Sequence, residues 1–144
     1  MTTEEVTLIA ALIAALTSIV TLGLNTRLAI LKEKRMLLWQ KELDRLLELE
    51  ETAGVAQEIA LSYASAEVLE KEFPPLHDQL RHAAGRFGRY PELSQALRDL
   101  NHACAVTVAE KVKSGDSREW QEKIKPAYQK FLNACDAITK REKT

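Results

Sequence analysis

The 144-residue sequence has little glycine, proline, cysteine and aromatic residue, and these shortages exclude several classes of protein. Five glycines and four prolines are too few for a collagen-like chain or a flexible linker. Aromatic residues make up only 6% of the chain, and β-branched residues do not gather in short alternating runs, which argues against an all-β fold. The length suits a single domain.

Net charge is also nearly absent, because 20 Lys and Arg residues face 21 Asp and Glu residues. No overall field therefore attracts nucleic acid, and we expect no nucleic-acid partner. The charges are unevenly placed along the chain. Every basic residue follows Leu24, and the first of them is Arg27.

The longest stretch without a charged residue runs from Val6 to Leu24. As a helix rising about 1.5 Å per residue, it would be about 28 Å long, close to the ~30 Å hydrocarbon thickness of a bilayer. Its hydroxyl side chains can bond to the backbone carbonyl one turn earlier, which makes them tolerable in lipid. These residues are Thr7, Thr17, Ser18 and Thr21. We therefore predict a transmembrane helix over residues 6–24, since a buried helix of a soluble bundle would normally show one polar face.

A cleaved signal peptide is the alternative for this segment, and it would need a basic amino-terminal region and a cleavage site between small residues. The preceding residues contain Glu4 and Glu5 but no Lys or Arg. Four basic residues instead follow the segment closely: Arg27, Lys32, Lys34 and Arg35. This asymmetry predicts a retained anchor in the plasma (inner) membrane, with residues 1–5 outside and residues 27–144 in the cytoplasm. The same basic residues could also contact anionic lipid headgroups, although the topology signal alone explains them.

Small and polar residues form one stripe along the predicted span. They recur at spacings of four and three: Thr7, Ala11, Ala14, Ser18, Thr21 and Asn25. Within lipid, helices associate through close backbone approach and interhelical hydrogen bonds rather than through apolar burial. The stripe therefore predicts association of the span with a second copy or with a helix of another membrane protein. The alternative is that the stripe is a chance result of alanine being common in membrane helices.

No glycine or proline lies between Leu24 and Ala53, so we expect the helix to continue as a juxtamembrane stalk over residues 25–52. No strand pattern follows. Apolar stripes of helical spacing predict a cytoplasmic bundle over residues 53–141, followed by a tail at 142–144. The predicted fold class is all-α, with a single N-terminal transmembrane helix running into a cytoplasmic bundle of four or five helices.

Breaker residues set the expected ends of the bundle helices. One stripe over residues 55–73 should end at Pro74 and Pro75, and a short helix should follow over 76–87. A longer stripe over 93–112 should be closed by Ser114 and Gly115. The last stripe, over 117–138, contains Pro126, which should kink or split it.

Residues that could support catalysis or metal binding are few. Cys104 and Cys135 fall on apolar stripes, and in a reducing compartment we expect them to be buried free thiols. Asp99 and His102 have the carboxylate-x-x-His spacing of metal sites in bundles, but no second such motif accompanies them, so we expect a solvated helix face. The sequence shows no enzyme motif. We expect no enzymatic activity, cofactor, metal or small-molecule substrate.

One basic cluster lies within thirteen residues: His77, Arg81, His82, Arg86 and Arg89. Arginine can bind phosphate or carboxylate through two parallel hydrogen bonds. The cluster is therefore a candidate docking surface for an acidic partner, a lipid headgroup or a nucleotide. The alternative is internal ion pairing with the preceding acids, which are Glu67, Glu70 and Glu72.

Together these features predict a non-enzymatic, single-pass membrane protein that self-associates or recruits a partner at the membrane. The layout resembles that of many small bacterial membrane proteins with one N-terminal anchor and a helical cytoplasmic domain. Two alternatives remain. The chain could be an accessory subunit of a larger membrane complex, such as a transporter or a defence system, or a membrane-perturbing effector whose span lines a pore.

Overall fold

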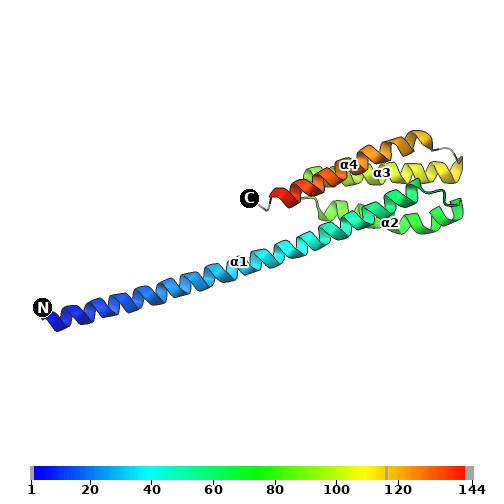
Figure 1. The fold of residues 1–144 in the computed structure, drawn as a ribbon. Coiled ribbons are helices and arrows are strands. Elements are labelled where there is room, and N and C mark those ends of the chain that lie inside the picture. Colours follow the sequence, from blue (N-terminus) through cyan, green and yellow to red (C-terminus); the bar gives the residue numbers. More distant parts are fainter. Residues whose placement is uncertain (1, 116, 142–144) are drawn as a thin grey trace. The chain divides into compact units, whose positions relative to one another are not determined.

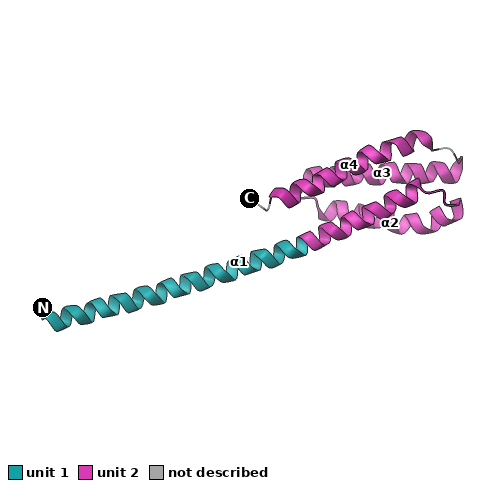
Figure 2. Cartoon of the chain, in the orientation of Figure 1, with its two compact units in different colours: residues 1–42 teal, residues 43–144 magenta. Residues whose placement is uncertain are grey.

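The computed structural model describes residues 2–115 and 117–141 of the chain. Over these residues the chain forms four helices: α1 (Thr3–Leu61), α2 (Ala66–Arg86), α3 (Pro91–Lys113) and α4 (Arg118–Arg141) (Figure 1). No strand occurs in the described part of the chain, and the predicted all-α class is confirmed. The chain divides into two compact units, residues 1–42 and residues 43–144, and α1 contributes to both (Figure 2). The predicted tail at 142–144 lies outside the described residues.

Unit 1 is the N-terminal part of α1, and reciprocal hydrogen bonds cap its start. The backbone N–H of Glu5 donates to Thr2 Oγ1 (3.3 Å), and the backbone N–H of Thr2 donates to Glu5 Oε2 (3.0 Å). Such a capping box satisfies backbone donors that the helix itself leaves open. Glu4 and Glu5 also lie in the first turn, where the helix dipole favours negative charge.

α1 is one continuous helix of 59 residues rather than separate membrane and bundle helices. It runs through the predicted stalk, passes Gly54 and ends at Leu61. The prediction of a helix over 55–73 was therefore wrong. A glycine inside a helix costs only about 1 kcal/mol relative to alanine. Ala53 and Ala56, which flank Gly54, are fully buried and pack this part of α1 into unit 2. The free energy gained by this packing outweighs the cost of the glycine.

The break between α1 and α2 falls at two serines, Ser62 and Ser65, rather than at the predicted glycine and prolines. Ser62 Oγ donates to the carbonyl of Ile59 (2.7 Å) at the end of α1. Ser65 is the N-cap of α2, and its Oγ accepts a hydrogen bond from the backbone N–H of Val68 (3.4 Å). Serine side chains favour such ends because they replace hydrogen bonds that the helix cannot make.

Three prolines lie inside helices, and none of them ends or splits its helix. Pro74 and Pro75 are within α2, so they do not end a helix, and Pro126 does not split α4. Each proline lacks the N–H that would bond to the carbonyl four residues earlier. The three prolines and the residues four positions before them are exposed, so water can bond to the freed carbonyls. The helices therefore continue.

Unit 2 is a bundle formed by α2, α3, α4 and the last part of α1. α3 packs against both α2 and α4, and ten of its residues are buried. Its predicted end is confirmed, since Gly115 follows it with a positive φ of 74°. Most predicted apolar positions of α2, α3 and α4 are buried. They include Leu69, Phe73, Leu80, Leu93, Leu97, Leu100, Val108, Ile124, Phe131 and Ile138.

The face that α1 buries in unit 2 differs from the predicted one. Its members alternate at spacings of three and four: Leu46, Leu49, Ala53, Ala56 and Ala60. The larger Val55 and Tyr63, which the prediction placed on the apolar stripe, are 41% and 107% exposed. Small alanine side chains allow helices to approach closely. The prediction followed the large apolar residues instead and therefore missed this alanine face.

A lysine of α3 caps the C-terminus of α1 by hydrogen bonding to its last carbonyl groups. Lys111 Nζ donates to the carbonyl oxygen of Ala60 (2.6 Å) and to that of Ser62 (2.8 Å). α1 has no basic residue in its own last turn, so Lys111 supplies the positive charge that a helix C-terminus favours. Burial lowers the pKa of the Lys111 ammonium from its ordinary value. The contact is therefore a partly dehydrated cap between helices far apart in sequence.

Candidate functional sites

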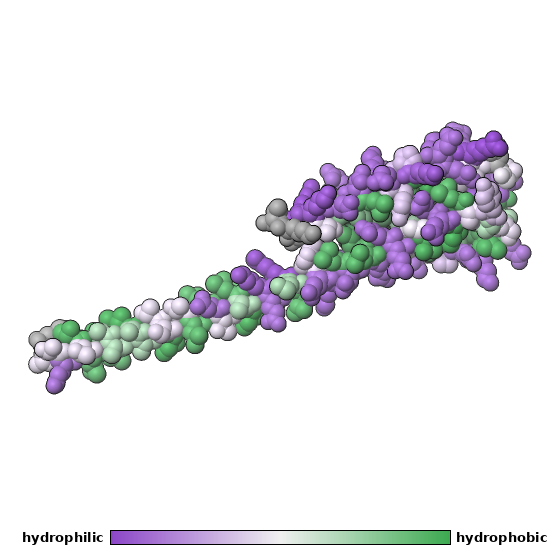
Figure 3. Space-filling model, viewed as in Figure 1, coloured by the Kyte–Doolittle hydropathy of each residue, from purple (hydrophilic) through white to green (hydrophobic). Residues whose placement is uncertain are grey.

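The apolar segment of α1 is uncovered in unit 1. An 18-residue window of this helix has a mean hydropathy of 2.3, and none of it is buried. The large apolar side chains between Val6 and Leu24 are 43–70% exposed. Figure 3 shows this segment as a green and pale stretch, whereas the visible surface of unit 2 is purple over much of its area, with smaller green areas. α1 is thus long and apolar enough to span a membrane.

The hydroxyl groups within this segment bond to the helix backbone, as predicted. Each donates to the carbonyl four residues earlier at 2.8–2.9 Å. The four donors are Thr7, Thr17, Ser18 and Thr21. The segment can therefore enter hydrocarbon without leaving these hydroxyl protons unsatisfied.

Small side chains leave two shallow hollows along the predicted stripe. Thr7 and Ala11 help line the first, near the start of α1. The remaining stripe residues line the second: Ala14, Ser18, Thr21 and Asn25. This surface suits the close approach of another helix. Association itself stays a prediction.

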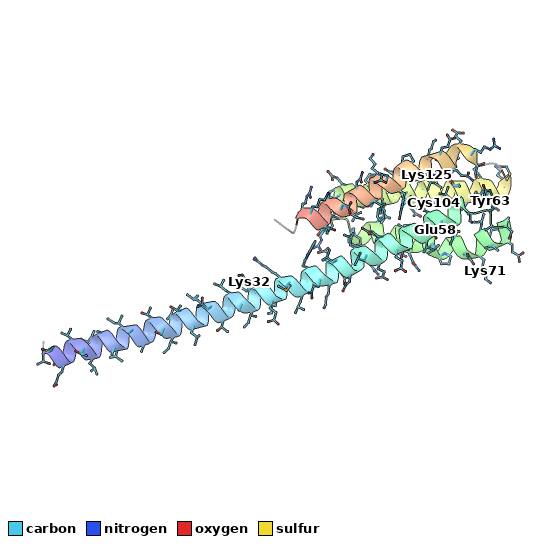
Figure 4. All side chains as sticks on the ribbon, in the orientation of Figure 1. Lys32, Glu58, Tyr63, Lys71, Cys104 and Lys125 are labelled. Carbon is cyan, nitrogen blue, oxygen red and sulfur yellow. The ribbon has the colours of Figure 1, made fainter. Side chains whose placement is uncertain are left out.

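The four juxtamembrane basic residues are exposed on the part of α1 in unit 1, where Figure 4 labels Lys32. At about 100° per residue, Arg27, Lys32, Lys34 and Arg35 spread over about half of the helix circumference. None forms an ion pair with another residue that the structure describes. We name these four residues, which lie on about half of the helix surface, the basic collar.

The structure separates the predicted basic cluster of residues 77–89. His77 and Arg81 line a hollow between α2 and α3, while His82 and Arg86 are exposed outside it. The Arg89 guanidinium lies 5.1 Å from the centre of the Tyr90 ring, beside a different hollow. The cluster is therefore not one surface.

The ion pairing of this cluster also differs from the alternative considered above. Within the described residues, Arg81 pairs with Asp78 of its own helix (3.5 Å), and both side chains are largely exposed. Arg81 and Arg86 form no ion pair there with the preceding glutamates, which are Glu67, Glu70 and Glu72.

We name the surface cavity between α2 and α3 the basic hollow; its volume is about 270 Å³. It is lined by His77, Leu80, Arg81, Ala84, Gly85, Arg98, Asn101, His102 and Ala105. Two cationic or imidazole pairs at i, i+4 spacing face it, one from each helix, and no acidic residue lines it. Arg98 was not predicted as a site residue, and His102 was considered only as a metal ligand. The matching i, i+4 spacing on both helices was the available signal.

Asn101 fixes the His77 side of the basic hollow. Asn101 is only 7% exposed, and its Oδ1 lies 2.9 Å from His77 Nδ1. Its Nδ2 donates to the backbone carbonyl of His77 (3.4 Å), so the amide oxygen is the group that accepts from the ring. Because Asn101 Oδ1 can only accept, the proton of the His77 ring lies on Nδ1, and Nε2 remains available to a ligand or to water.

The other side of the hollow is in contact with a tryptophan. The His102 ring meets the Trp120 ring edge-on, with their centres 5.9 Å apart. Lys123 Nζ lies 4.1 Å from the centre of the same indole. Asp99 and His102 are both exposed, as predicted, and Asp99 Oδ1 accepts a hydrogen bond from Gln95 (2.9 Å). No group of three or more metal-ligating side chains occurs in the described residues.

Both cysteines are free and buried, as predicted. Figure 4 labels Cys104 on α3. Burial raises the pKa of the Cys104 thiol to about 12. Burial, together with the nearby Glu50 carboxylate, raises the pKa of Cys135 as well. Neither thiol is a competent nucleophile at neutral pH, because the thiolate is the reactive form.

Comparison with protein-family models, with curated proteins and with solved structures found no match to this chain. Three features therefore remain as the basis for a functional argument. They are the uncovered apolar segment, the basic collar that follows it, and the basic hollow of the bundle.

Proposed function

We propose that this chain is a non-enzymatic, single-pass membrane protein that associates through α1 with a second copy or with a helix of a partner. The observation that supports this is the uncovered apolar surface of residues 6–24. Ten large apolar side chains lie there about half exposed. Their burial is worth on the order of 10 kcal/mol, comparable to the whole stability of a small domain. Lipid or a partner helix must therefore cover them.

The proposed topology places residues 1–5 outside and unit 2 in the cytoplasm of the plasma (inner) membrane. The basic collar is its support, because cationic residues flanking a span remain on the cytoplasmic side. Glu4 and Glu5 at the other end carry the opposite charge. The collar also lies where anionic headgroups would add about 1 kcal/mol per basic residue.

Membrane insertion can be tested by fractionation and topology labelling. We expect full-length protein to stay with membranes after alkaline carbonate washing and to keep its intact mass, which excludes cleavage of a signal peptide. A membrane-impermeant maleimide should label Thr2→Cys in intact cells and the exposed Lys130→Cys only after permeabilisation. The native thiols are buried and should not interfere. The reverse labelling pattern would overturn the topology.

Association can be tested by absolute mass from light scattering in mild detergent. Self-association predicts an oligomer that the double variant Ala14→Leu, Ser18→Leu reduces to a monomer, because larger side chains block close approach. The matched control is Ile13→Leu, Val20→Leu, which changes the opposite face and should leave the mass unchanged.

A monomeric wild type would overturn self-association. Capture from native membranes through the same stripe would then favour the accessory-subunit alternative. Ion leak on expression, lost in the stripe variant, would favour the pore alternative instead. In both alternatives residues 6–24 still span the membrane, and only the partner of the small-residue stripe differs.

A further inference from the structure

We propose that the basic hollow binds the phosphate group of a small soluble compound. This inference goes beyond the proposed function, which requires no ligand. The hollow brings together Arg81 and His77 of α2 with Arg98 and His102 of α3. The two arginines of its lining donate hydrogen bonds, the neutral His77 ring offers Nε2 as an acceptor to a protonated phosphate oxygen, and no lining residue is acidic.

The charges around the hollow favour an anion. Arg81 and Arg98 are permanently charged and come from two different helices. Two carboxylates flank these arginines in the sequence: Asp78 pairs with Arg81 at 3.5 Å, and Asp99 accepts a hydrogen bond from Gln95. The Asp78–Arg81 pair is exposed, and exposed pairs are weak, so an anion can compete for the guanidinium.

Phosphate fits this set of donors better than a carboxylate does. One arginine fork satisfies a carboxylate, whereas the oxygens of a phosphate group can accept from several donors that converge from different directions. Asn101 already holds His77 in one orientation, so part of the site is preorganised. The volume of about 270 Å³ lies just below the range of small-ligand pockets.

The ligand should be small rather than a polyanion such as nucleic acid. Residues 43–144 contain 15 Lys and Arg but 17 Asp and Glu, a net charge of −2. A long chain of phosphates would meet this net negative surface over most of its length. A single phosphate group meets only the local basic lining.

Trp120 provides the measurement, because its ring contacts His102 at the edge of the hollow. We would titrate full-length protein in zwitterionic detergent with inorganic phosphate and with pyrophosphate, at constant ionic strength against chloride. A Trp39→Phe background leaves Trp120 as the single reporter. We expect a saturable change in its fluorescence that chloride does not reproduce. An unsaturable change, equal to that with chloride, would overturn the proposal.

Charge-matched variants locate the response. Arg98→Gln should weaken binding about tenfold or more, since a hydrogen bond to a charged partner is lost. Arg86→Gln removes the same charge from α2 outside the hollow and should change binding by less than about twofold. Asp78→Asn should tighten binding about twofold to fivefold by releasing Arg81. Equal weakening by Arg98→Gln and Arg86→Gln would show non-specific charge attraction and overturn the site.

Gly85→Leu separates loss of binding from loss of folding. Gly85 lines the hollow, and a Cβ added there meets no atom within 4 Å. The variant should block the hollow while leaving the melting temperature unchanged or higher, because glycine weakens helices. Unchanged phosphate binding in this variant would place the ligand elsewhere.

Lipid headgroups share the phosphate chemistry, so a second arm distinguishes the source. The titration is repeated in nanodiscs with and without phosphatidylglycerol. Equal midpoints support a soluble ligand. A midpoint raised by phosphatidylglycerol in the wild type, but not in the Arg98→Gln variant, would assign the hollow to headgroups and overturn the soluble ligand.

Discussion

Lys111→Met tests whether the lysine cap stabilises the junction between α1 and the bundle. The substitution keeps most of the apolar stem and removes the ammonium that donates to the carbonyls of Ala60 and Ser62. Those carbonyls lie at the end of α1, where the helix has no later N–H to satisfy them. We therefore expect the bundle to lose stability while its fold is retained.

The magnitude follows from the two contacts and one opposing cost. Hydrogen bonds to charged groups contribute about 1.5–3 kcal/mol each, and the two here are short, at 2.6 and 2.8 Å. Dehydration of the ammonium, which lowers the pKa of Lys111, offsets part of this gain. The two carbonyls can partly rehydrate in the variant. We expect a net loss of about 2–3 kcal/mol in the free energy of unfolding.

Urea unfolding followed by Trp120 fluorescence in mild detergent measures this loss, because Trp120 belongs to α4 of unit 2. Helical circular dichroism is less suitable, since the apolar segment stays helical in the detergent. The matched control is Lys113→Met, which removes an exposed lysine from the same end of α3. It should cost less than about 0.5 kcal/mol. Equal unfolding midpoints for the two variants would refute the cap.

Two further predictions concern backbone and thiol chemistry. Gly54→Ala should stabilise unit 2 by about 0.5–1 kcal/mol in the same assay, because the added Cβ meets only Tyr128 Oη, at an ordinary 3.4 Å. Gly115→Ala should destabilise unit 2 by about 1 kcal/mol, because Gly115 has a φ of +74°, which alanine adopts at a cost. The reverse order would contradict the helical role of Gly54. Because burial raises the pKa of Cys104 from 9.0 to about 12, the unfolded state releases this proton first and stability falls as pH rises above about 9. Between about pH 8 and pH 10 the wild type should lose about 1 kcal/mol more than Cys104→Ala, and parallel pH profiles would contradict this.

The helical class and most of the core could be predicted, because apolar residues that recur at helical spacing mark the buried face of a helix in a single sequence. The stripe through Leu93, Leu97 and Leu100 is buried as expected. The end of α1 and the start of α2 could not be predicted in this way. Prolines were treated as local stops, whereas exposure of Pro74 and Pro75 lets water satisfy the carbonyls that they free. The true break uses serine hydrogen bonds and a lysine from another helix, which no local pattern displays.

Only the α2 side of the candidate site could be predicted from the sequence, for a similar reason. Proximity along the chain grouped His77 and Arg81 with Arg86 and Arg89, which the fold separates. The residues that complete the basic hollow come from α3, and only helix packing brings Arg98 beside α2. The predicted cluster therefore contained two of the four Arg and His residues that line the hollow, together with three residues that do not line it: His82, Arg86 and Arg89.

The lining of the basic hollow favours binding over catalysis. It contains no serine, threonine or cysteine that could attack a bound phosphate ester. His77 is oriented by the Asn101 amide, and an amide oxygen does not stabilise an imidazolium as a buried carboxylate would. The buried thiols are held in their protonated form, since burial raises the pKa of both. On the two proposals above, the chain would hold a phosphate compound in this hollow at the membrane through Arg81 and Arg98.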